Sequence, residues 1–114
     1  MSFDVQTGES ARDLALARVE AAAREDFKQQ ATEVIRYVAR YSEKFTTDRV
    51  WYYLQQRGVE PPHEPRVLGA LMRNAVRAGW IVGTSQHVLS SKSSNHRRPI
   101  RVWQSLLYEG GSDA

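Results

Sequence analysis

The hydrophobic period of this chain of 114 residues changes at Gly79, and that change limits the possible folds more than any other feature. Before Gly79, apolar residues recur three or four positions apart, as they do on helices that pack on a core. After it, they alternate with polar residues, as they do in half-buried strands. We therefore expect a mainly α chain that ends in a small β-hairpin, which is an α+β fold.

The first 45 residues are expected to be largely helical. Residues 1–8 show no period and are expected to be disordered. Residues 9–25 are rich in Ala, Leu, Arg and Glu, which favour helix. An apolar stripe then recurs at intervals of 4, 3, 4, 3 and 4, formed by Phe27, Ala31, Val34, Val38, Tyr41 and Phe45. The stripe predicts a core-facing helix, which either continues the first one or bends near residues 25–26.

Two shorter helices are expected next. Residues 45–48 predict a short extended link and a helix start, with an acidic residue in the first turn. Gly58 is a natural end for that helix. Residues 59–64 contain two prolines and interrupt the helical pattern, and a third helix is expected over residues 65–78. Its inward residues are expected to be Val67, Leu68, Leu71, Ala75 and Ala78.

The hairpin is expected in the last third of the chain. Residues 80–82 resemble a strand, residues 83–85 (Gly-Thr-Ser) are typical of a turn, and residues 86–90 are compatible with an extended chain. A polar, basic loop over residues 91–98 follows, and residues 100–104 alternate as a second strand. The expected organisation is therefore a disordered N-terminus, an N-terminal helix, a main domain over residues 26–108 and a flexible tail over residues 109–114.

Charge is divided unevenly along the chain. No acidic residue lies between Pro65 and Tyr108, a stretch with seven basic ones, whereas the other 70 residues hold nine basic and thirteen acidic side chains. The net charge of +3 conceals this division. Like charges on one surface repel each other, so such segregation is useful where a face meets a polyanion. Nucleic acid is the first candidate partner.

The order helix, short strand, helix, helix, hairpin resembles the winged-helix variant of the helix-turn-helix proteins. Two stretches are the basis of the resemblance: residues 45–51 (Phe-Thr-Thr-Asp-Arg-Val-Trp) and residues 71–81, which are similar to the end of a recognition helix and the start of a wing. The resemblance covers about residues 27–106. The link over residues 59–64 is longer than the usual turn of roughly 3–4 residues.

Three short phrases give a narrower resemblance. They are Phe-Thr-Thr-Asp, Glu-Pro-Arg-x-Leu-Gly and His-x-Arg-Pro-Ile-x-Val-Trp, and they are similar to small proteins of bacteriophages and prophages of actinobacteria. This narrower resemblance implies an origin rather than a mechanism. Taken with the winged-helix resemblance, it leads us to expect a phage or prophage regulator or DNA-metabolism accessory factor in the cytoplasm of a bacterial host.

The winged-helix resemblance implies double-stranded DNA as the partner, with the third helix in the major groove and the wing as a second contact. On the helix, Arg73 and Asn74 have the chemistry to read guanine and adenine edges, respectively. Arg66 is expected to meet phosphate, and Arg77 is suited to either role. The remaining expected contacts lie on the wing and the returning strand: Lys92, Asn95, His96, Arg97, Arg98 and Arg101.

Other partners fit the same pattern. The basic face or the N-terminal helix would suit a protein-interaction module that binds a host or phage protein, and the N-terminal helix would also suit a homodimer. A basic surface without any partner, the solvated face of an amphipathic helix and a disordered hairpin tip are the plainer readings of these residues. The three tryptophans are expected in the core or at its edge rather than as platforms for base stacking.

Catalytic and metal-binding functions lack support in the sequence. There is no cysteine, and the histidines do not have a zinc spacing. No nucleophile elbow, phosphate-binding loop or zinc motif is present, and the basic half has no carboxylate for magnesium. No run of 18 apolar residues suggests a membrane span. We therefore expect no catalytic residue, no metal, no cofactor and no membrane partner.

Overall fold

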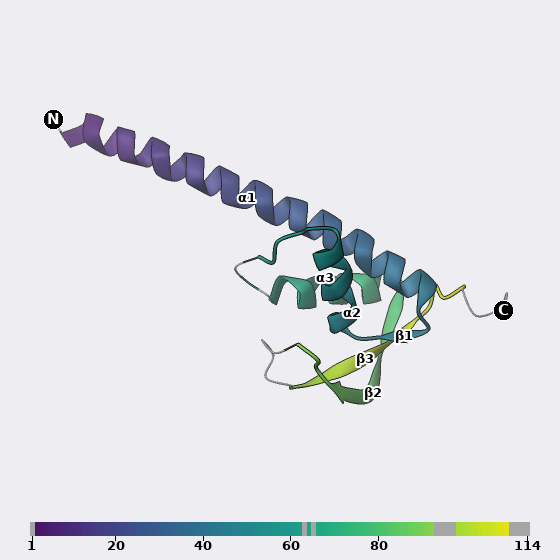
Figure 1. The fold of residues 1–114 in the computed structure, drawn as a ribbon. Helices are drawn as coiled ribbons and strands as arrows, with labels where there is room; N and C mark the ends of the chain where they lie inside the picture. The colour runs from purple at the N-terminus through teal and green to yellow at the C-terminus, as the bar shows by residue number, and fades with distance from the viewer. Residues whose placement is uncertain (1, 63, 65, 93–97, 110–114) are drawn as a thin grey trace.

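The computed structural model describes residues 2–62, 64, 66–92 and 98–109. These residues form three helices and a three-stranded antiparallel sheet (Figure 1). The elements in chain order are α1 (Ser2–Tyr41), β1 (Lys44–Phe45), α2 (Thr47–Gln56), α3 (Arg66–Arg77), β2 (Ile81–Leu89) and β3 (Pro99–Ser105). The α+β class expected from the sequence is confirmed, and it includes a short strand between the first two helices.

α1 is one helix of 40 residues, so the chain continues through residues 25–26 without a break. The structure differs from the disorder expected for residues 1–8, because residues 2–8 also belong to α1. Each residue added to a formed helix gains a hydrogen bond, and no proline interrupts this stretch. Residues 2–26 span about 37 Å, and Phe27 is the first buried residue among the side chains that the structure describes. This half of the helix projects from the rest of the molecule, and with it the whole molecule extends over 72 Å along its longest axis (Figure 1).

The core lies where the second half of α1 packs against α2, α3 and the sheet. Tyr41 does not reach it: its side chain is 56% exposed and its ring lies 4.9 Å from that of Tyr37. Ala39 and Met72 are buried although the expected stripes did not include them. The other members of the first stripe are buried as expected: Phe27, Ala31, Val34, Val38 and Phe45. Around this core lie three half-buried tryptophans, Trp51, Trp80 and Trp103.

Glycines end both short helices, as the sequence predicts. Gly58 and Gly79 have φ angles of +74° and +81°, a region that other residues rarely adopt. After α3 the amide of Trp80 donates to the carbonyl of Ala75 at 3.0 Å, which closes the helix end. Ala78 lies in this turn and is exposed, so the expectation that it points inward is wrong.

The sheet has the order β1-β3-β2, with β3 in the centre. Trp103 of β3 pairs with Phe45 on one side and with Gly83 on the other. The amide of Ser105 at the end of β3 donates to the carbonyl of Glu43 at 2.8 Å. The strand that follows α1 and the hairpin that follows α3 therefore form one sheet.

The turn expected over residues 83–85 is wrong, because β2 runs through them as a single strand. The pairing with β3 shifts register between Gly83 and His87, which marks a bulge or a similar irregularity in the ladder. The hydroxyl of Thr84 donates to the carbonyl of Val102 at 2.7 Å and accepts from the amide of Gln86 at 3.1 Å. Residues with turn chemistry are thus accommodated inside a strand by bonds to the neighbouring strand.

The chain after β3 is tied back to α1. Ser105 donates its hydroxyl to the carbonyl of Ala39, and Arg40 Nε donates to Glu109 Oε2 at 3.0 Å. The pKa of Arg40 lies above its ordinary value because of this hydrogen bond and the negative charge of Glu109. Glu109 was expected to belong to the flexible tail, whereas its backbone amide also donates to Arg40 at 3.1 Å. Residues 110–114 of that tail lie outside the described part.

Candidate nucleic-acid interface

Three arginines lie on the face of α3 that points away from the core. Arg66, Arg73 and Arg77 are exposed, and their spacings of seven and four residues align them along one side of the helix. The opposite side packs into the core through Leu68, Leu71, Met72 and Ala75. The amphipathic pattern of this segment therefore sets the direction of its arginines.

The other expected contact on α3 lies beside this row. Asn74 is exposed, but it is about a quarter turn round the helix from the arginines. Gly69 and Ala70, which lie between Arg66 and Arg73 in the sequence, are half-buried. The side chain of Arg73 folds toward Gly69, and its Nη1 lies 3.9 Å from where a Cβ added to that glycine would be. Small residues thus leave the backbone of α3 accessible between the long cationic side chains.

The arginines of α3 have no acidic partner among the described residues. The ion pairs found there join Lys28 to Glu25, Arg40 to Glu109 and Arg57 to Glu33. All three pairs involve α1, and none includes a cation of α3 or of the hairpin. Uncompensated charges on one side of a small domain produce a positive potential that attracts anions.

Two more arginines extend from the hairpin formed by β2 and β3. Arg98 and Arg101 are exposed, and neither pairs with a carboxylate in the described part of the chain. The guanidinium of Arg101 lies 5.8 Å from the ring centroid of Trp103. It also passes close to Gly83, where a Cβ would lie 3.0 Å from Nη1. The glycine therefore leaves the space that this guanidinium occupies.

Lys92 has a different environment from the one expected for a free phosphate contact. Its ammonium nitrogen lies 4.7 Å from the ring centroid of Trp51 on α2, and the side chain is half-buried. A cation over an aromatic face is attracted by the negative potential of the ring. Lys92 thus contributes a contact between the base of the hairpin and α2.

Asp48 provides the second contact between α2 and the hairpin, and sequence reasoning missed it. Its carboxylate accepts hydrogen bonds from the hydroxyl of Ser90 at 2.9 Å and from the amide of Ser91 at 2.7 Å. The hydroxyl of Ser91 donates to it as well, at 3.1 Å. The sequence suggested only a favourable charge in the first turn of α2, because the serines lie more than 40 residues further along the chain.

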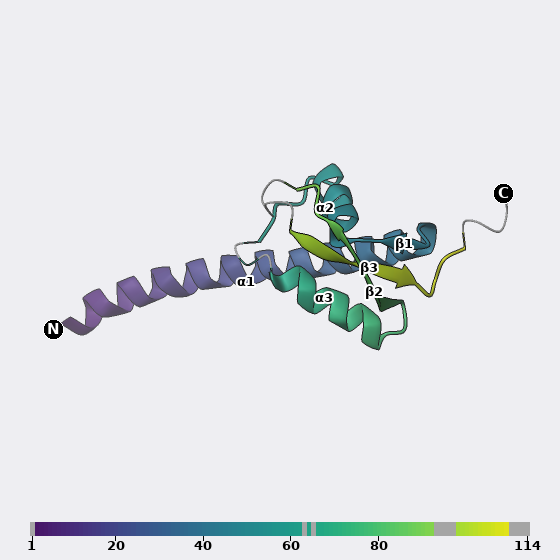
Figure 2. The same cartoon turned by 90° about the horizontal axis from the view of Figure 1, so that it is seen from below.

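Figure 2 shows how these parts lie relative to one another. Seen from below, α3 and the hairpin lie next to each other, with α2 beyond the hairpin and α1 behind all three. Figure 1 agrees, because the hairpin begins where α3 ends and turns back beneath it. Three of the expected wing contacts, Asn95, His96 and Arg97, lie outside the described residues.

Other kinds of site find little support in the described part of the chain. No group of three or more His, Cys, Asp or Glu side chains there is placed to hold a metal ion. Likewise, none of its helices has an apolar stretch long enough to cross a membrane. In comparisons with known proteins, no family model, curated protein or solved structure matches this chain.

Proposed function

We propose that this chain is a winged-helix protein that binds double-stranded DNA, with α3 in the major groove and the β2–β3 hairpin as the wing. The element order and the sheet order β1-β3-β2 support this reading. A helix of 12 residues is about 18 Å long, a length that a major groove accommodates. A role as a phage or prophage regulator or accessory factor is part of the same proposal and depends on the resemblance of the sequence.

One observation is the main support: Arg66, Arg73 and Arg77 are exposed in a row, without acidic partners, beside a hairpin that presents Arg98 and Arg101 in the same way. Phosphate groups spaced along a duplex match such an arrangement. Arginine binds phosphate oxygens and guanine edges through two parallel hydrogen bonds, so each side chain is suited to either contact.

Fluorescence titration of a generic labelled duplex at several salt concentrations tests the proposal. If all five arginines meet phosphates, the logarithm of affinity falls with the logarithm of salt at a slope of about −4.5, or about 0.9 for each contact. Arg73→Ala and Arg77→Ala should each make the slope shallower by about one and weaken binding.

Arg18→Ala is the matched control, because Arg18 is exposed on the projecting half of α1 and far along the helix from α3. It removes the same charge and should leave the slope unchanged. Equal slopes for all three variants would show that attraction is unspecific. No binding of duplex DNA at low salt would refute the proposal, and binding to an acidic protein instead would favour an interaction module.

A further inference from the structure

The projecting half of α1 has an apolar face that nothing in the described chain covers. Leu16 and Val19 are 57% and 67% exposed, and Ala23 is exposed as well. Leu16 lies eighteen residues before Val34, which is five full turns of helix, so both residues are on the same side. The stripe that packs into the core from Phe27 onward thus continues outward along the helix into solvent.

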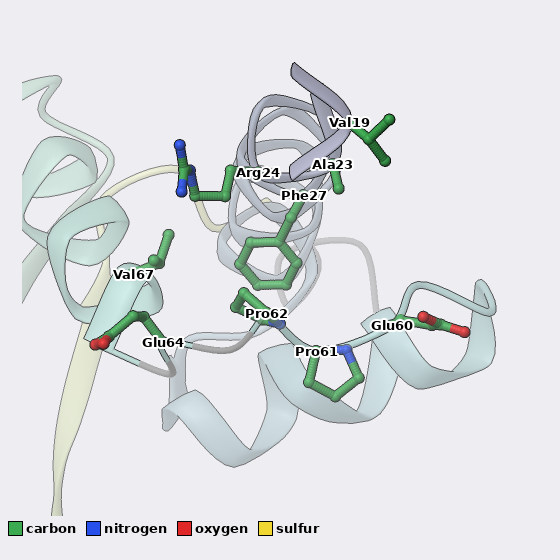
Figure 3. Close-up of a pocket in the computed structure, with 9 residues that line it drawn as sticks. All are labelled: Val19, Ala23, Arg24, Phe27, Glu60, Pro61, Pro62, Glu64 and Val67. Atoms are coloured by element: carbon green, nitrogen blue, oxygen red, sulfur yellow. The ribbon is translucent and has the colours of Figure 1, made fainter. Parts of the chain in front are cut away.

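The inner end of this stripe enters a groove of about 320 Å³ between α1 and the loop that precedes α3 (Figure 3). The ring of Phe27 points from α1 toward Pro62, and Val67 lies across the groove. Three charged side chains lie at its rim, the carboxylates of Glu60 and Glu64 and the guanidinium of Arg24. The groove is therefore apolar inside, with an excess of one negative charge at its edge.

A helix that projects without tertiary contacts is only marginally stable in water, even when it is made of good helix formers. Covering the stripe would stabilise it, because each buried Leu or Val side chain leaves water. The charges on α1 indicate which partner buries the stripe. Arg12 and Asp26 are both exposed, and Asp26 forms no ion pair with any side chain that the structure describes.

We propose that two copies of this chain pair through the projecting halves of α1, antiparallel and centred on Val19. Arg12 lies seven residues before Val19 and Asp26 seven residues after it. An antiparallel pair with this centre therefore brings Arg12 of each copy next to Asp26 of the other, twice in the dimer. By helical position Arg12 lies between Val19 and Ala23, and Asp26 lies about 20° beyond Val19, so both residues are on the same side of Leu16, as a two-fold axis across the pair requires.

In the same register, the second copy also occupies the groove beside Phe27. Leu16 of one copy lies level with Ala22 and Ala23 of the other, whose small side chains allow close approach. Arg12 then reaches the second copy at the level of Phe27, where Glu60 and Glu64 lie at the rim of the groove. Within one copy Arg12 lies 15 residues, or about 22 Å along the helix, from Phe27, so a single copy cannot join this cation to these acids. A second copy that runs the other way can.

Light scattering and sedimentation velocity on the full chain at tens of micromolar test this proposal, which does not depend on DNA binding. The parent should be a dimer, and Leu16→Glu should weaken association by at least about 100-fold, because the change occurs twice in the interface. Leu14→Glu is the matched control: Leu14 is also 57% exposed, but it lies roughly 160° round the helix from Leu16. It should leave the dimer intact.

Charge reversal identifies the partner and its orientation. Arg12→Glu and Asp26→Arg should each weaken the dimer, and the double variant should restore part of the lost affinity, because the pair is remade with opposite sign while Glu60 and Glu64 still oppose a carboxylate at position 12. Circular dichroism checks that each variant keeps its folded core. A monomeric parent at about 100 μM, equal effects of the two leucine variants, or no restoration by the double variant would each overturn the proposal. So would a parent that stays monomeric and binds only a different protein.

Discussion

A single substitution at Asp48 should weaken the contact between the hairpin and the helical body more clearly than a substitution elsewhere. Its carboxylate accepts from three donors of the hairpin base, the hydroxyl of Ser90 and the amide and hydroxyl of Ser91, at 2.7–3.1 Å. Ser90 is buried, whereas Asp48 is half-buried and Ser91 is exposed. Asp48→Ala removes all three bonds and a favourable charge in the first turn of α2.

The size of the expected loss in stability follows from how far water reaches these three hydrogen bonds. A hydrogen bond to a charged group contributes about 1.5–3 kcal/mol when it is sheltered. Two of the three bonds are reached by water, so we take about 0.5–1 kcal/mol for each of the three. The helix-dipole contribution adds about 0.3–1 kcal/mol. Asp48→Ala should therefore lower the free energy of unfolding by about 2–4 kcal/mol, and Asp48→Asn by about half as much, because the amide keeps one acceptor oxygen.

Urea unfolding followed by circular dichroism, at one fixed protein concentration, measures these differences. Glu43→Ala is the control, since that side chain is exposed and makes no ion pair among the described residues. It should change stability by less than about 0.5 kcal/mol. A double-mutant cycle with Ser91→Ala should show a coupling of at least about 0.5 kcal/mol. Additive effects, or an Asp48→Ala variant as stable as the Glu43 control, would refute this account of the hairpin contact.

The two glycines of the α3 region should respond in opposite directions to the same substitution in the same urea assay. Gly79→Ala should destabilise by about 1–2 kcal/mol, because its φ of +81° is costly for a residue with a Cβ. Gly69→Ala should stabilise by about 0.5–1 kcal/mol, because it lies inside the helix and the new Cβ meets only the end of Arg73 at 3.9 Å. A loss of stability at Gly69 would mean that this face of α3 has less space than the structure shows.

The parts of the fold that the sequence predicted correctly are those set by neighbouring residues. Gly58 and Gly79 end their helices because a positive φ is a property of the glycine itself. The stripe from Phe27 to Val38 identifies its own buried face through its period. The exposure of Arg73 and Arg77 follows in the same way, since it depends only on which residues of α3 are apolar.

The parts that could not be predicted depend on residues far apart in the chain. Thr84 lies in a segment with turn chemistry, yet it is held in a strand by the carbonyl of Val102. The bonds from Ser90 to Asp48 span 42 residues, and no local pattern indicates them. Good helix formers do not by themselves tell one long helix from two shorter ones. Lys92 likewise has the composition of a wing cation, and only its approach to Trp51 shows what it contacts.

The two proposals together make a geometric prediction about the DNA. Val67 shares a groove with Phe27, and Arg36 lies 5.7 Å over the ring of Trp80, so α3 runs beside the stretch of α1 from about residue 27 to residue 36. The middle of that stretch is about 12 residues from the dimer centre, or about 18 Å along the helix. In the dimer, the two copies of α3 are then about 36 Å apart along α1, which is close to one turn of B-DNA.

A duplex of about 24 base pairs should therefore engage both copies of α3, whereas one of about 12 base pairs offers room for only one. At equal salt the longer duplex should bind more than 10-fold tighter for each dimer, and its salt slope should be about twice as steep, because twice as many phosphates are contacted. Leu16→Glu should abolish the difference in affinity while leaving binding to the short duplex unchanged. If the affinity of this variant still depends on duplex length, DNA binding does not depend on dimerisation. If the parent has the same salt slope on both duplexes, the paired helices do not place the two copies of α3 on successive turns of the DNA.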